Sequence, residues 1–475
     1  MASGLISTEV NLSICAPQKE NRRGIIPLKV RAVSERTVSE AMSNAAAFRE
    51  PRDRLKILLV GHAFWPGEGS EPGITWNWAW HLCHHHDVWV IAHPLHRAEV
   101  EAAISGHSGQ VPRVVWADLP REPEQGERGI RLHYLRWQRV ALEQARCLDA
   151  RERFDIVHHV SWATITWAPK LWSLGPPFVW GPLGGGQVAP LRFCRSLGWR
   201  GTFGETARKL RVQLLPFLPR LRQAAANSAL VLATNPETAE ILYRAGAPQV
   251  ELFYDNGILP EQLAPRRAER RAGDPLELVW AGRLEVRKGL PLALEAMARV
   301  SDLPVRLSIA GQGPLRSLYE RHAAALGLAD KVRFLGFVPR ERLLADIFAS
   351  SDGFLFTSLQ DSAASVVLEA MAAGLPVIGL DHQGAGMMMP EHAAIKVPVT
   401  SPSATMQGLA DGIRALAASP ELGQRLSEAA RRHAATESWS LRAARMSALY
   451  QSCLNARSGR ARSPARWSNR VALAK

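Results

Sequence analysis

The feature that most constrains the fold of this chain is a repeated alternation of short apolar segments with longer amphipathic ones. The first series of apolar runs lies at 56–64, 87–93, 112–117, 154–160, 177–186, 229–234 and 249–254. A short, uninterrupted apolar run is typical of a strand that is buried on both faces, and the segments between these runs have helical character. Strands that alternate with helices predict a parallel sheet covered by helices on both faces.

The alternation is interrupted at APRRAERRAGDP (264–275), which is charged, has no apolar periodicity and contains Gly and Pro near its end. These are properties of an interdomain linker. A second series of strand-like runs follows at 276–282, 305–311, 332–337, 353–357 and 376–380, and two long helical stretches at 404–419 and 421–454 close the chain. We therefore predict two α/β domains, each Rossmann-like and doubly wound, which face each other across a cleft that is the default ligand site.

At 475 residues the chain is too long for one hydrophobic core, which supports two domains with additional segments at the ends. The predicted parts are a mobile N-terminal extension (1–52), an N-terminal domain (53–263), the linker (264–275), a C-terminal domain (276–437), a closing helix that packs back on the N-terminal domain (438–455) and a basic tail (456–475).

Basic residues are concentrated in two places. The net charge is +14, and the segment 188–224 contains eight basic residues against Glu205 alone, whereas 456–475 contains six basic residues and no acid. Charge that is local indicates local anionic contacts. A nucleic-acid-binding protein is not favoured, because the chain also lacks a recognisable motif for that function.

Cysteine usage and hydropathy bear on the compartment. The five cysteines are scattered, are odd in number and form no CxxC pair, which fits a reducing compartment better than a disulfide framework. The first residues lack a basic segment followed by an apolar core, and no uncharged apolar run approaches the roughly 20 residues that a spanning helix needs. We therefore expect a cytoplasmic protein without a secretory signal or a membrane span.

Three glycine-rich segments each follow a predicted strand: GEGSEPG (67–73), GPLGGG (181–186) and GQGP (311–314). Glycine at such a position lets backbone amides approach a ligand, but it also suits a tight turn from a strand to a helix. None of the three segments alone decides between these two interpretations. The first does not match GxGxxG, and no Walker motif is present, so NAD-binding and P-loop proteins are set aside.

Charged side chains are predicted at the carboxyl ends of two strands in the C-terminal domain. Arg283 and Lys288 lie in AGRLEVRKG (281–289), where two cations either neutralise a diphosphate or are surface charges around a turn. Asp361 and Glu369 lie in an otherwise small and apolar stretch. Ionised carboxylates are costly to bury unless a partner or ligand binds them, so this pair marks a candidate site.

These motifs resemble those of retaining glycosyltransferases of family 4, which have the GT-B fold. The resemblance rests on GRLEVRKG, then AGQGPL, then SLQDSAASVVLEAMAAGLPVI, together with DNGI at 255–258. The family signature is an acid, seven residues, then Glu followed by Ala-Met-Ala-x-Gly-x-Pro-Val. Segments in the matching order extend from about Lys56 to Leu454.

The resemblance implies roles for the positions that match. Glu369 would bind the ribose hydroxyls of a nucleotide, Asp361 the hydroxyls of the donor sugar, and Arg283 and Lys288 the diphosphate. Further residues implied to contact the nucleotide sugar are Gly311, Gly313, Ser365 and Val366, and residues implied to shape the acceptor side are Gly69, Gly73, Gly184, Gly185 and Gly186. The chain departs from the family at Asp361-Ser362-Ala363-Ala364, where Glu-Gly-Phe-Gly is usual.

Histidines enter this hypothesis in two ways. Relatives often place a histidine near the donor sugar, and HHV at the end of a predicted strand offers His158, which we prefer as a catalytic candidate facing the cleft, or His159. The alternative is an ordinary packed or exposed histidine. The run HLCHHH (81–86) has histidines four residues apart, as in some zinc sites, but no carboxylate or second cysteine completes the set. We interpret it as a helix end that suits histidines, and we expect no metal or other cofactor.

The sequence thus predicts a metal-independent, retaining hexosyltransferase that uses a nucleotide-diphosphate sugar and a saccharide or lipid-linked acceptor in exopolysaccharide or envelope-glycan synthesis. Alternatives are a nucleotide-sugar epimerase with the same fold and a degenerate, non-catalytic sugar-binding protein. The basic and aromatic segment 188–224 suits the anionic inner face of the cytoplasmic membrane, and the alternative is a solvated helical insertion that caps the acceptor cleft.

Overall fold

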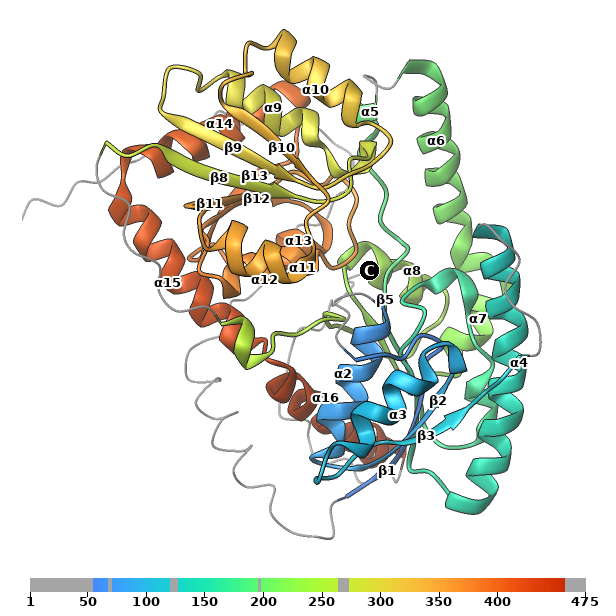
Figure 1. Cartoon of the computed structure of the whole chain (residues 1–475). Coiled ribbons are helices and arrows are strands. Elements are labelled where there is room, and N and C mark those ends of the chain that lie inside the picture. Colours follow the sequence, from blue (N-terminus) through green and yellow to red (C-terminus); the bar gives the residue numbers. More distant parts are fainter. Residues whose placement is uncertain (1–53, 67–70, 120–126, 195–197, 264–272, 458–475) are drawn as a thin grey trace, which may run out of the picture.

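The computed structural model describes residues 54–66, 71–119, 127–194, 198–263 and 273–457. The predicted extension (1–52), most of the linker and all but the first two residues of the basic tail lie outside these residues. The described chain forms two domains, each built on a parallel sheet with helices on both faces (Figure 1). The prediction of two Rossmann-like, doubly wound α/β domains is confirmed.

The N-terminal sheet has seven parallel strands in the order β3-β2-β1-β4-β5-β6-β7. The strands are β1 (Lys56–Val60), β2 (Asp87–Ala92), β3 (Arg113–Trp116), β4 (Ile156–His159), β5 (Phe178–Leu183), β6 (Leu230–Ala233) and β7 (Val250–Leu252). The order reverses between β1 and β4, which pair in parallel, and ligands of such sheets bind beyond the carboxyl ends of the strands at this switch point.

Two hydrophobic cores cover the faces of this sheet. Its helices are α2 (Glu71–Cys83), α3 (Arg97–Ser105), α4 (Glu127–Glu152), α5 (Leu191–Cys194), α6 (Gly198–Leu214), α7 (Pro219–Ala226) and α8 (Pro236–Arg244). One core contains Trp137 of α4 and Leu242 of α8, and the other contains Trp78 of α2. The central strands β4, β5 and β6 are buried along their whole length, and they show continuous apolar runs instead of alternation, whereas the edge strand β3 is partly exposed.

The C-terminal sheet has six parallel strands in the order β10-β9-β8-β11-β12-β13, with its switch point between β8 and β11. The strands are β8 (Leu276–Ala281), β9 (Val305–Ala310), β10 (Val332–Gly336), β11 (Gly353–Phe356), β12 (Val377–Asp381) and β13 (Ala394–Pro398). The helices are α9 (Leu290–Ala298), α10 (Arg316–Ala325), α11 (Arg340–Arg342) with its π-helical continuation (Leu343–Phe348), α12 (Ser365–Ala372), α13 (Gln383–Met388), α14 (Pro402–Ala418) and α15 (Pro420–Thr436).

Short 3₁₀ turns complete the elements at Pro94–His96, Ile165–Trp167, Leu171–Leu174, Leu215–Phe217, Pro260–Gln262 and Val286–Lys288. Strand β13 and helix α13 were not predicted, because only one strand-length apolar run was identified after α12. The glycine-rich segment 67–73 overlaps the first helix, since α2 starts at Glu71 and includes Gly73. None of the helices in the described residues is both long and apolar enough to cross a bilayer.

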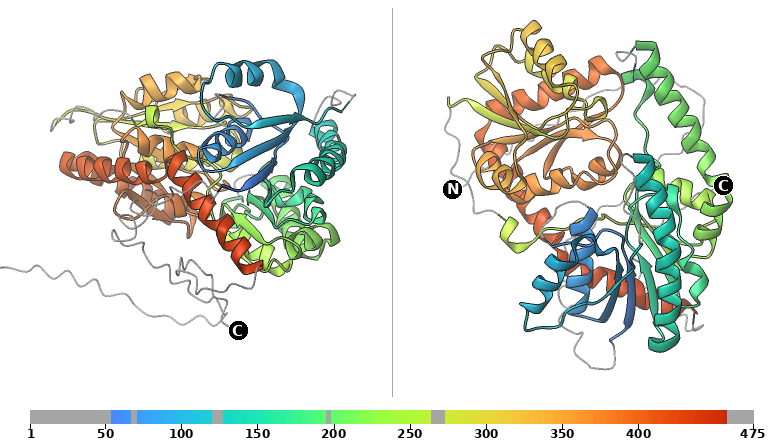
Figure 2. Two further views of the ribbon diagram at one scale, coloured as in Figure 1. Left: turned by 90° about the horizontal axis from the view of Figure 1, so that it is seen from below. Right: turned by 45° about the vertical axis from the view of Figure 1, so that its right-hand side comes forward.

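The C-terminal end of the described chain returns to the N-terminal domain through α16 (Trp439–Arg457) (Figures 1 and 2). Met446 and Tyr450 of α16 are fully buried in the same core as Trp78. The helical stretch at 421–454 divides between α15 and α16, next to the predicted start of the closing helix at 438, and Ser438 forms an isolated β-bridge there with Ile258. The buried Arg442 donates to Glu437 at 2.7 Å, so a paired charge stabilises this crossing point.

The basic segment 188–224 does not form one insertion of the N-terminal domain. Ala189 and Phe193, at its start, are buried in the hydrophobic core of the C-terminal domain. Helix α6 then stands along the side of the molecule (Figure 2), and α7 packs on the N-terminal core through Leu221. The segment therefore contacts both domains, and α6 is its most exposed part.

Candidate active site

The loops that follow β8 and β11 meet at the switch point of the C-terminal sheet. Lys288 ends the loop after β8, Asp361 lies in the loop after β11, and the two side chains form a hydrogen-bonded ion pair. Both side chains are largely buried, with 16% and 17% of their surfaces exposed. The fold thus brings together two predicted site residues that are 73 positions apart in the sequence.

Gly289 is required for this meeting of loops. It has a φ of 63°, and a Cβ atom there would lie 2.2 Å from the carbonyl oxygen of Thr357. Thr357 in turn donates from its hydroxyl to the carbonyl oxygen of Lys288 at 3.1 Å. A larger residue at position 289 would force the two loops apart, because its Cβ would overlap the backbone of the other loop.

Arg283 lies further out than Lys288. Its side chain is 71% exposed and its Nε is 2.8 Å from Glu285 Oε1, while the other oxygen of Glu285 accepts from Arg287. Arg283 thus stands at the same sheet edge as Lys288, on the same loop, but the structure shows no contact between the two cations. Its ion pair is exposed and holds it only weakly.

The GQGP loop packs against the loop after β8. A Cβ atom at Gly311 would lie 1.8 Å from the carbonyl oxygen of Gly282, and one at Gly313 would lie 2.6 Å from that of Leu284. The close approach of the two loops accounts for both glycines without a ligand. Their predicted role in nucleotide-sugar binding stays a prediction.

Glu369 lies inside α12 and is 6% exposed. Arg340, at the start of α11, donates from Nε and Nη2 to Glu369 Oε1 at 3.1 and 2.8 Å. Burial raises the pKa of Glu369, and the nearby guanidinium opposes that rise. Ser365 and Val366 form the first turn of the same helix. Arg340 was not predicted, although its position four residues after the strand that ends at Gly336 is a usable signal.

The departure from the family pattern has a structural consequence at Ala364. This residue precedes α12 with φ 43° and ψ 52°, in the left-handed region that glycine adopts without cost. It stands where relatives have the second glycine of Glu-Gly-Phe-Gly. The chain therefore keeps the left-handed backbone conformation at this position although it lacks the glycine.

The N-terminal domain holds the loop that carries Asp361. Gln383 accepts from the Asp361 backbone N–H at 3.0 Å and donates to the carbonyl oxygen of Val188 at 2.9 Å. Asn235 donates to the carbonyl oxygen of Ser362 at 3.3 Å. A Cβ atom at Gly184 would lie 2.6 Å from Cβ of Ser362, so the loop 184–186 faces the C-terminal domain at close range. The sequence analysis did not identify Gln383 or Asn235.

Of the other glycines predicted for the acceptor side, Gly185 has a φ of 110° and Gly186 packs against Thr238 of α8. Gly73 is not a loop residue, because it is buried in the first turns of α2. Gly69 lies outside the described residues.

Among the described residues of the N-terminal domain, four carboxyl groups have a buried oxygen without a hydrogen-bond partner, and Glu71 and Asp255 are two of them. Glu71 Oε1 accepts from the backbone N–H of Ala163 at 2.8 Å, which joins the loops after β1 and β4, but its Oε2 is buried and unpaired. Oδ1 of Asp255, which follows β7, is also buried and unpaired. Burial raises the pKa of Glu71 to about 7 and that of Asp255 to about 6. A negative charge on Asp361 also raises the pKa of Asp255, which relates this group to the donor-side loop.

The prediction that His158 faces the cleft is wrong. Its side chain is fully buried inside β4, where Nδ1 lies 2.6 Å from Tyr450 Oη and Nε2 lies 2.7 Å from the carbonyl oxygen of Gly181. Burial lowers its pKa to about 4, so the ring is neutral and both nitrogens are engaged. His159 points to the opposite face, where its Nε2 lies 3.1 Å from Tyr134 Oη, and it is equally buried. Helices on both faces of the strand cover both rings.

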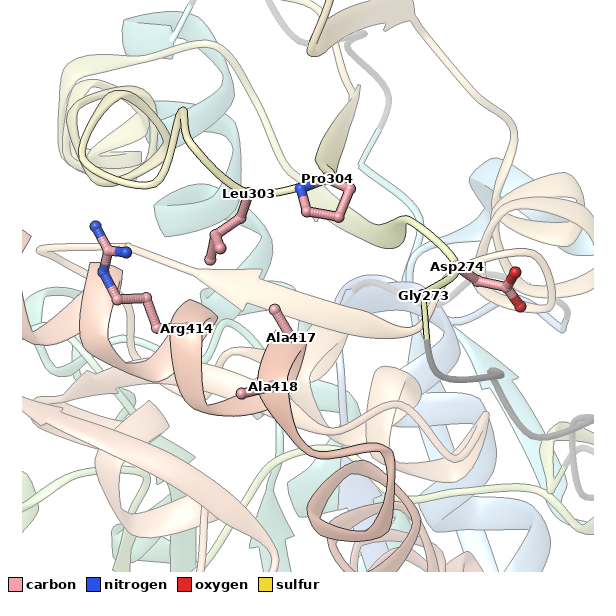
Figure 3. A pocket seen from close by; sticks show the side chains of 7 residues that line it. All are labelled: Gly273, Asp274, Leu303, Pro304, Arg414, Ala417 and Ala418. Atoms are coloured by element: carbon pink, nitrogen blue, oxygen red, sulfur yellow. The ribbon is translucent and has the colours of Figure 1, made fainter.

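The hollow in Figure 3 lies elsewhere. It is lined by Gly273, Asp274, Leu303, Pro304, Arg414, Ala417 and Ala418. The first four residues directly precede β8 and β9, so this hollow lies at the amino edge of the C-terminal sheet. Lys288 and Asp361 are at the carboxyl edge, and the hollow is therefore not part of the candidate site.

Comparison with known proteins agrees with this geometry. Residues 262–433 match the family model described as "Glycosyl transferases group 1". The D-inositol 3-phosphate glycosyltransferase of Corynebacterium glutamicum (strain R) is 32% identical over 203 residues, which are 40% of this chain and 47% of that protein. The GDP-mannose-dependent alpha-(1-6)-phosphatidylinositol dimannoside mannosyltransferase of Mycobacterium tuberculosis is 29% identical over 237 residues, or 47% of this chain and 58% of that protein. The chain thus spans about half the length of these curated relatives.

Solved structures are similar over most of the chain. Sucrose-phosphate synthase from Thermosynechococcus elongatus has a TM-score of 0.58 at 19% identity and covers 85% of this chain and 100% of its own. The Anabaena HepE protein in complex with UDP and glucose has a TM-score of 0.52 at 18% identity and covers 84% of this chain and 100% of its own. At these identities the likeness concerns the fold. Residues 262–433 thus match the glycosyl transferases group 1, and the two domains together have the architecture of GT-B glycosyltransferases.

Proposed function

We propose that this protein is a retaining glycosyltransferase of family 4 that transfers a hexose from a nucleotide-diphosphate sugar to a saccharide or lipid-linked acceptor. The observation that carries the proposal is the buried Lys288–Asp361 pair, which stands at the switch point of the domain that matches glycosyl transferases group 1. Relatives named for inositol-phosphate and phosphatidylinositol mannoside substrates and for colanic acid biosynthesis support a sugar acceptor and a role in envelope or exopolysaccharide synthesis.

The pair suits the charges that develop during transfer. When the anomeric C–O bond breaks, its electron pair goes to the leaving diphosphate and positive charge builds on the sugar. Lys288 is placed to stabilise the departing anion, with Arg283 on the same loop, and Asp361 is placed to accept hydrogen bonds from donor hydroxyls. Retention implies that the acceptor attacks from the face that the diphosphate leaves. In this proposal cationic side chains take the part that a metal has in other transferases.

The unpaired carboxyl oxygens of Glu71 and Asp255 suit the binding of an acceptor. Glu71 and Asp255 present buried oxygens without partners, and sugar hydroxyls are suitable donors to such oxygens. We assign no covalent nucleophile, and we place Glu71 and Asp255 as acceptor-binding groups.

A donor screen tests the proposal. Full-length protein is incubated with UDP-, GDP- and ADP-sugars, each with and without a saccharide or lipid-linked acceptor, and the nucleotide and sugar products are measured. We expect nucleotide diphosphate release that depends strongly on the acceptor. Conversion of the donor to an epimer without an acceptor would favour the epimerase, and tight donor binding without any product would favour the non-catalytic sugar-binding protein.

The proposal extends to the surface on which the protein works. Phe203, Leu210 and Leu214 of α6 are more than half exposed, on the same helix as the exposed Arg208 and Arg211. Exposed apolar residues beside basic ones suit the anionic inner face of the cytoplasmic membrane. The location of the protein at that membrane is part of the proposal.

The arginines of this segment are not equivalent. Arg220 donates to the carbonyl oxygen of Ala168 at 2.8 Å and to Gln138 Oε1 at 2.7 Å, so it stabilises the N-terminal domain. The membrane test therefore replaces Arg208, Lys209 and Arg211 together by alanine. Sedimentation with vesicles of phosphatidylglycerol and phosphatidylcholine should fall sharply, whereas a chain that ends at Arg457 should still sediment. Unchanged sedimentation of the triple variant would contradict membrane binding through α6.

A further inference from the structure

Three histidines from distant parts of the chain meet at the carboxyl edge of the N-terminal sheet. His62 follows β1, His93 follows the adjacent strand β2, and His133 lies on α4. One nitrogen of each ring lies within 4.8 Å of those of the other two. The rings are packed together, with His62 stacked on His93 at a centroid distance of 4.9 Å and His133 edge-on to both.

The nitrogens of this cluster are available to a ligand. Nε2 of His62 and Nε2 of His133 are buried and have no hydrogen-bond partner. A buried nitrogen without a hydrogen-bond partner is unfavourable, because it has lost the hydrogen bond that water would make with it. Two such nitrogens in one cluster therefore need an explanation. Three imidazoles at this spacing cannot all be protonated, because the like charges would repel each other, and each neutral ring has one nitrogen lone pair.

We propose that His62, His93 and His133 form a binding site for a divalent transition-metal ion, of which Zn²⁺ is the best match. Imidazole nitrogen suits Zn²⁺, and three protein ligands leave the fourth tetrahedral position open for water or a substrate group. Ca²⁺ and Mg²⁺ are poor matches, because both prefer oxygen ligands. This site is separate from the Lys288–Asp361 pair, where the proposed transfer needs no metal.

Metal binding requires a modest rearrangement. Ligand nitrogens around Zn²⁺ stand about 3.3 Å apart when each bond is about 2.0–2.1 Å. The three histidine nitrogens lie within 4.8 Å of one another, so small movements of the rings are enough to reach that spacing. Nδ1 of His93 now accepts from the backbone N–H of Leu95 at 3.2 Å, in an exposed position. A neutral imidazole has one nitrogen lone pair in the ring plane, and that lone pair now accepts the hydrogen bond at Nδ1. His93 must therefore lose this bond to bind a metal ion, whichever nitrogen becomes the ligand.

The surroundings indicate what the ion would do. His62 packs edge-on against Tyr134 and Trp162, and Ala163, the next residue, donates its backbone N–H to Glu71. An ion at the cluster would thus connect α4 and the ends of β1 and β2 to the loop after β4, in which Ala163 binds Glu71. We infer that it stiffens the edge of the N-terminal sheet that bears Glu71, which the proposed function assigns to the acceptor.

Equilibrium metal binding tests this site without any activity assay. Untagged full-length protein is stripped with a chelator and titrated with Zn²⁺ against a chromophoric competitor, and Co²⁺ is used in parallel as a spectroscopic probe. We expect one Zn²⁺ per chain and visible Co²⁺ absorption of the intensity that tetrahedral coordination gives. His133→Gln and His93→Gln should each weaken Zn²⁺ binding by at least roughly 100-fold, since even loss of an outer-shell partner costs about 10–100-fold.

The matched control is the histidine run that the sequence makes conspicuous. His84→Gln combined with His85→Gln, at the end of α2 in the same domain, should leave Zn²⁺ binding unchanged. His93 is only partly buried, so its variant keeps the test valid if His133→Gln does not fold, as judged by circular dichroism. Absence of stoichiometric binding by the wild type would overturn the proposal. So would binding that survives His93→Gln and is lost in the His84/His85 variant.

Discussion

The two domains share an all-parallel, doubly wound plan, but the carboxyl edges of their sheets differ in charge. In the C-terminal domain, carboxylates at this edge are paired with cations: Asp361 with Lys288, Glu369 with Arg340, and Glu285 with Arg283 and Arg287. In the N-terminal domain, the corresponding edge presents the cluster of His62, His93 and His133 and the unpaired carboxyl oxygens of Glu71 and Asp255.

In the proposed function, one backbone plan serves two kinds of ligand, and this difference in charge suits them. Paired charges remain ionised when partly buried, and they can rearrange around an anionic diphosphate. Buried groups without a counter-ion shift toward their neutral forms, as the raised pKa of Glu71 shows, and neutral polar groups suit an uncharged polyol. The proposed function places the charged donor at one domain and the acceptor at the other, and the difference between the two edges is consistent with that proposal.

The largest expected effect concerns the charge of the C-terminal edge. Lys288→Ala should lower kcat by about 10²–10³-fold, because removal of one preplaced group that stabilises developing charge has an effect of this order. The matched control is Arg306→Ala, which breaks an exposed ion pair with Glu277 near the amino ends of β8 and β9. Its rate should stay near that of the wild type. Near-full turnover by Lys288→Ala would contradict the leaving-group role.

A second prediction separates the ion pair of Glu369 with Arg340 from the proposed binding of the nucleotide sugar by Glu369. Arg340→Ala should lower the free energy of unfolding by about 2 kcal/mol, because it leaves a buried carboxylate without its cation. The pKa of Glu369, already raised by burial, should rise further. Glu369→Gln should cost less stability, since it removes the charge as well as the pair, but it should raise KM for the nucleotide sugar. Urea denaturation and donor titration measure the two effects.

The pairing account would be contradicted if Arg340→Ala and Glu369→Gln destabilised the protein equally. The ligand role of Glu369 would be contradicted if KM for the donor were unchanged in Glu369→Gln.

The buried Glu71 at the N-terminal edge predicts that the stability of the protein depends on pH. The pKa of Glu71 is raised from 4.5 to about 7 in the folded protein, so between these values the unfolded chain releases a proton that the folded chain keeps. The contribution of Glu71 to stability is therefore highest below pH 4.5 and falls as pH rises to about 7. The free energy of unfolding of Glu71→Gln, relative to that of the wild type, should therefore rise by on the order of 2 kcal/mol between pH 5 and pH 8.

Denaturation at the two pH values checks this prediction, with Glu99→Gln as a control in the same domain because Glu99 is exposed on α3. The difference between Glu99→Gln and the wild type should be the same at both pH values. A pH-independent difference for Glu71→Gln would contradict the assignment of a raised pKa to Glu71.

The smallest expected effect tests the left-handed residue before α12. Ala364→Gly removes a strain of about 1–2 kcal/mol but loses about 0.5–1 kcal/mol through the greater freedom of the unfolded chain, so a slight stabilisation is expected. Ala370→Gly, inside the same helix and buried, should destabilise by about 1–2 kcal/mol. Thermal denaturation measures both variants. A destabilisation of Ala364→Gly equal to that of Ala370→Gly would contradict the strain.

Sequence patterns predicted most of the fold because buried parallel strands are continuous apolar runs. They failed where an element is short or its pattern is mixed. Strand β13, AIKVP, is only partly buried, and α13 has two glycines among its six residues. The closing helix was placed from 438, and α16 begins at Trp439, but the pairing of Ser438 with Ile258, 180 residues away, was not predicted.

The candidate site was predictable in part for the same reason. Lys288 and Asp361 follow predicted strands, and carboxyl ends of neighbouring parallel strands share an edge. The partners that fix the site were not predictable: Arg340 for Glu369, and Gln383 and Asn235 for the loop with Asp361. His158 was misplaced because a strand residue at a carboxyl end faces either the cleft or a covering helix, and the local sequence does not distinguish the two.

The sequence by itself determined the class of the fold, its two-domain division and the donor-side motifs, because these depend on local periodicity and on residues close together in the chain. Only the tertiary structure decided which charges pair, that Tyr450 of α16 buries His158, and that His62, His93 and His133 meet. Strand order sets these contacts: β1 lies between β2 and β4, so side chains far apart in the sequence share one edge. A run such as HLCHHH is conspicuous in the sequence, whereas a cluster assembled by sheet topology leaves no local pattern to read.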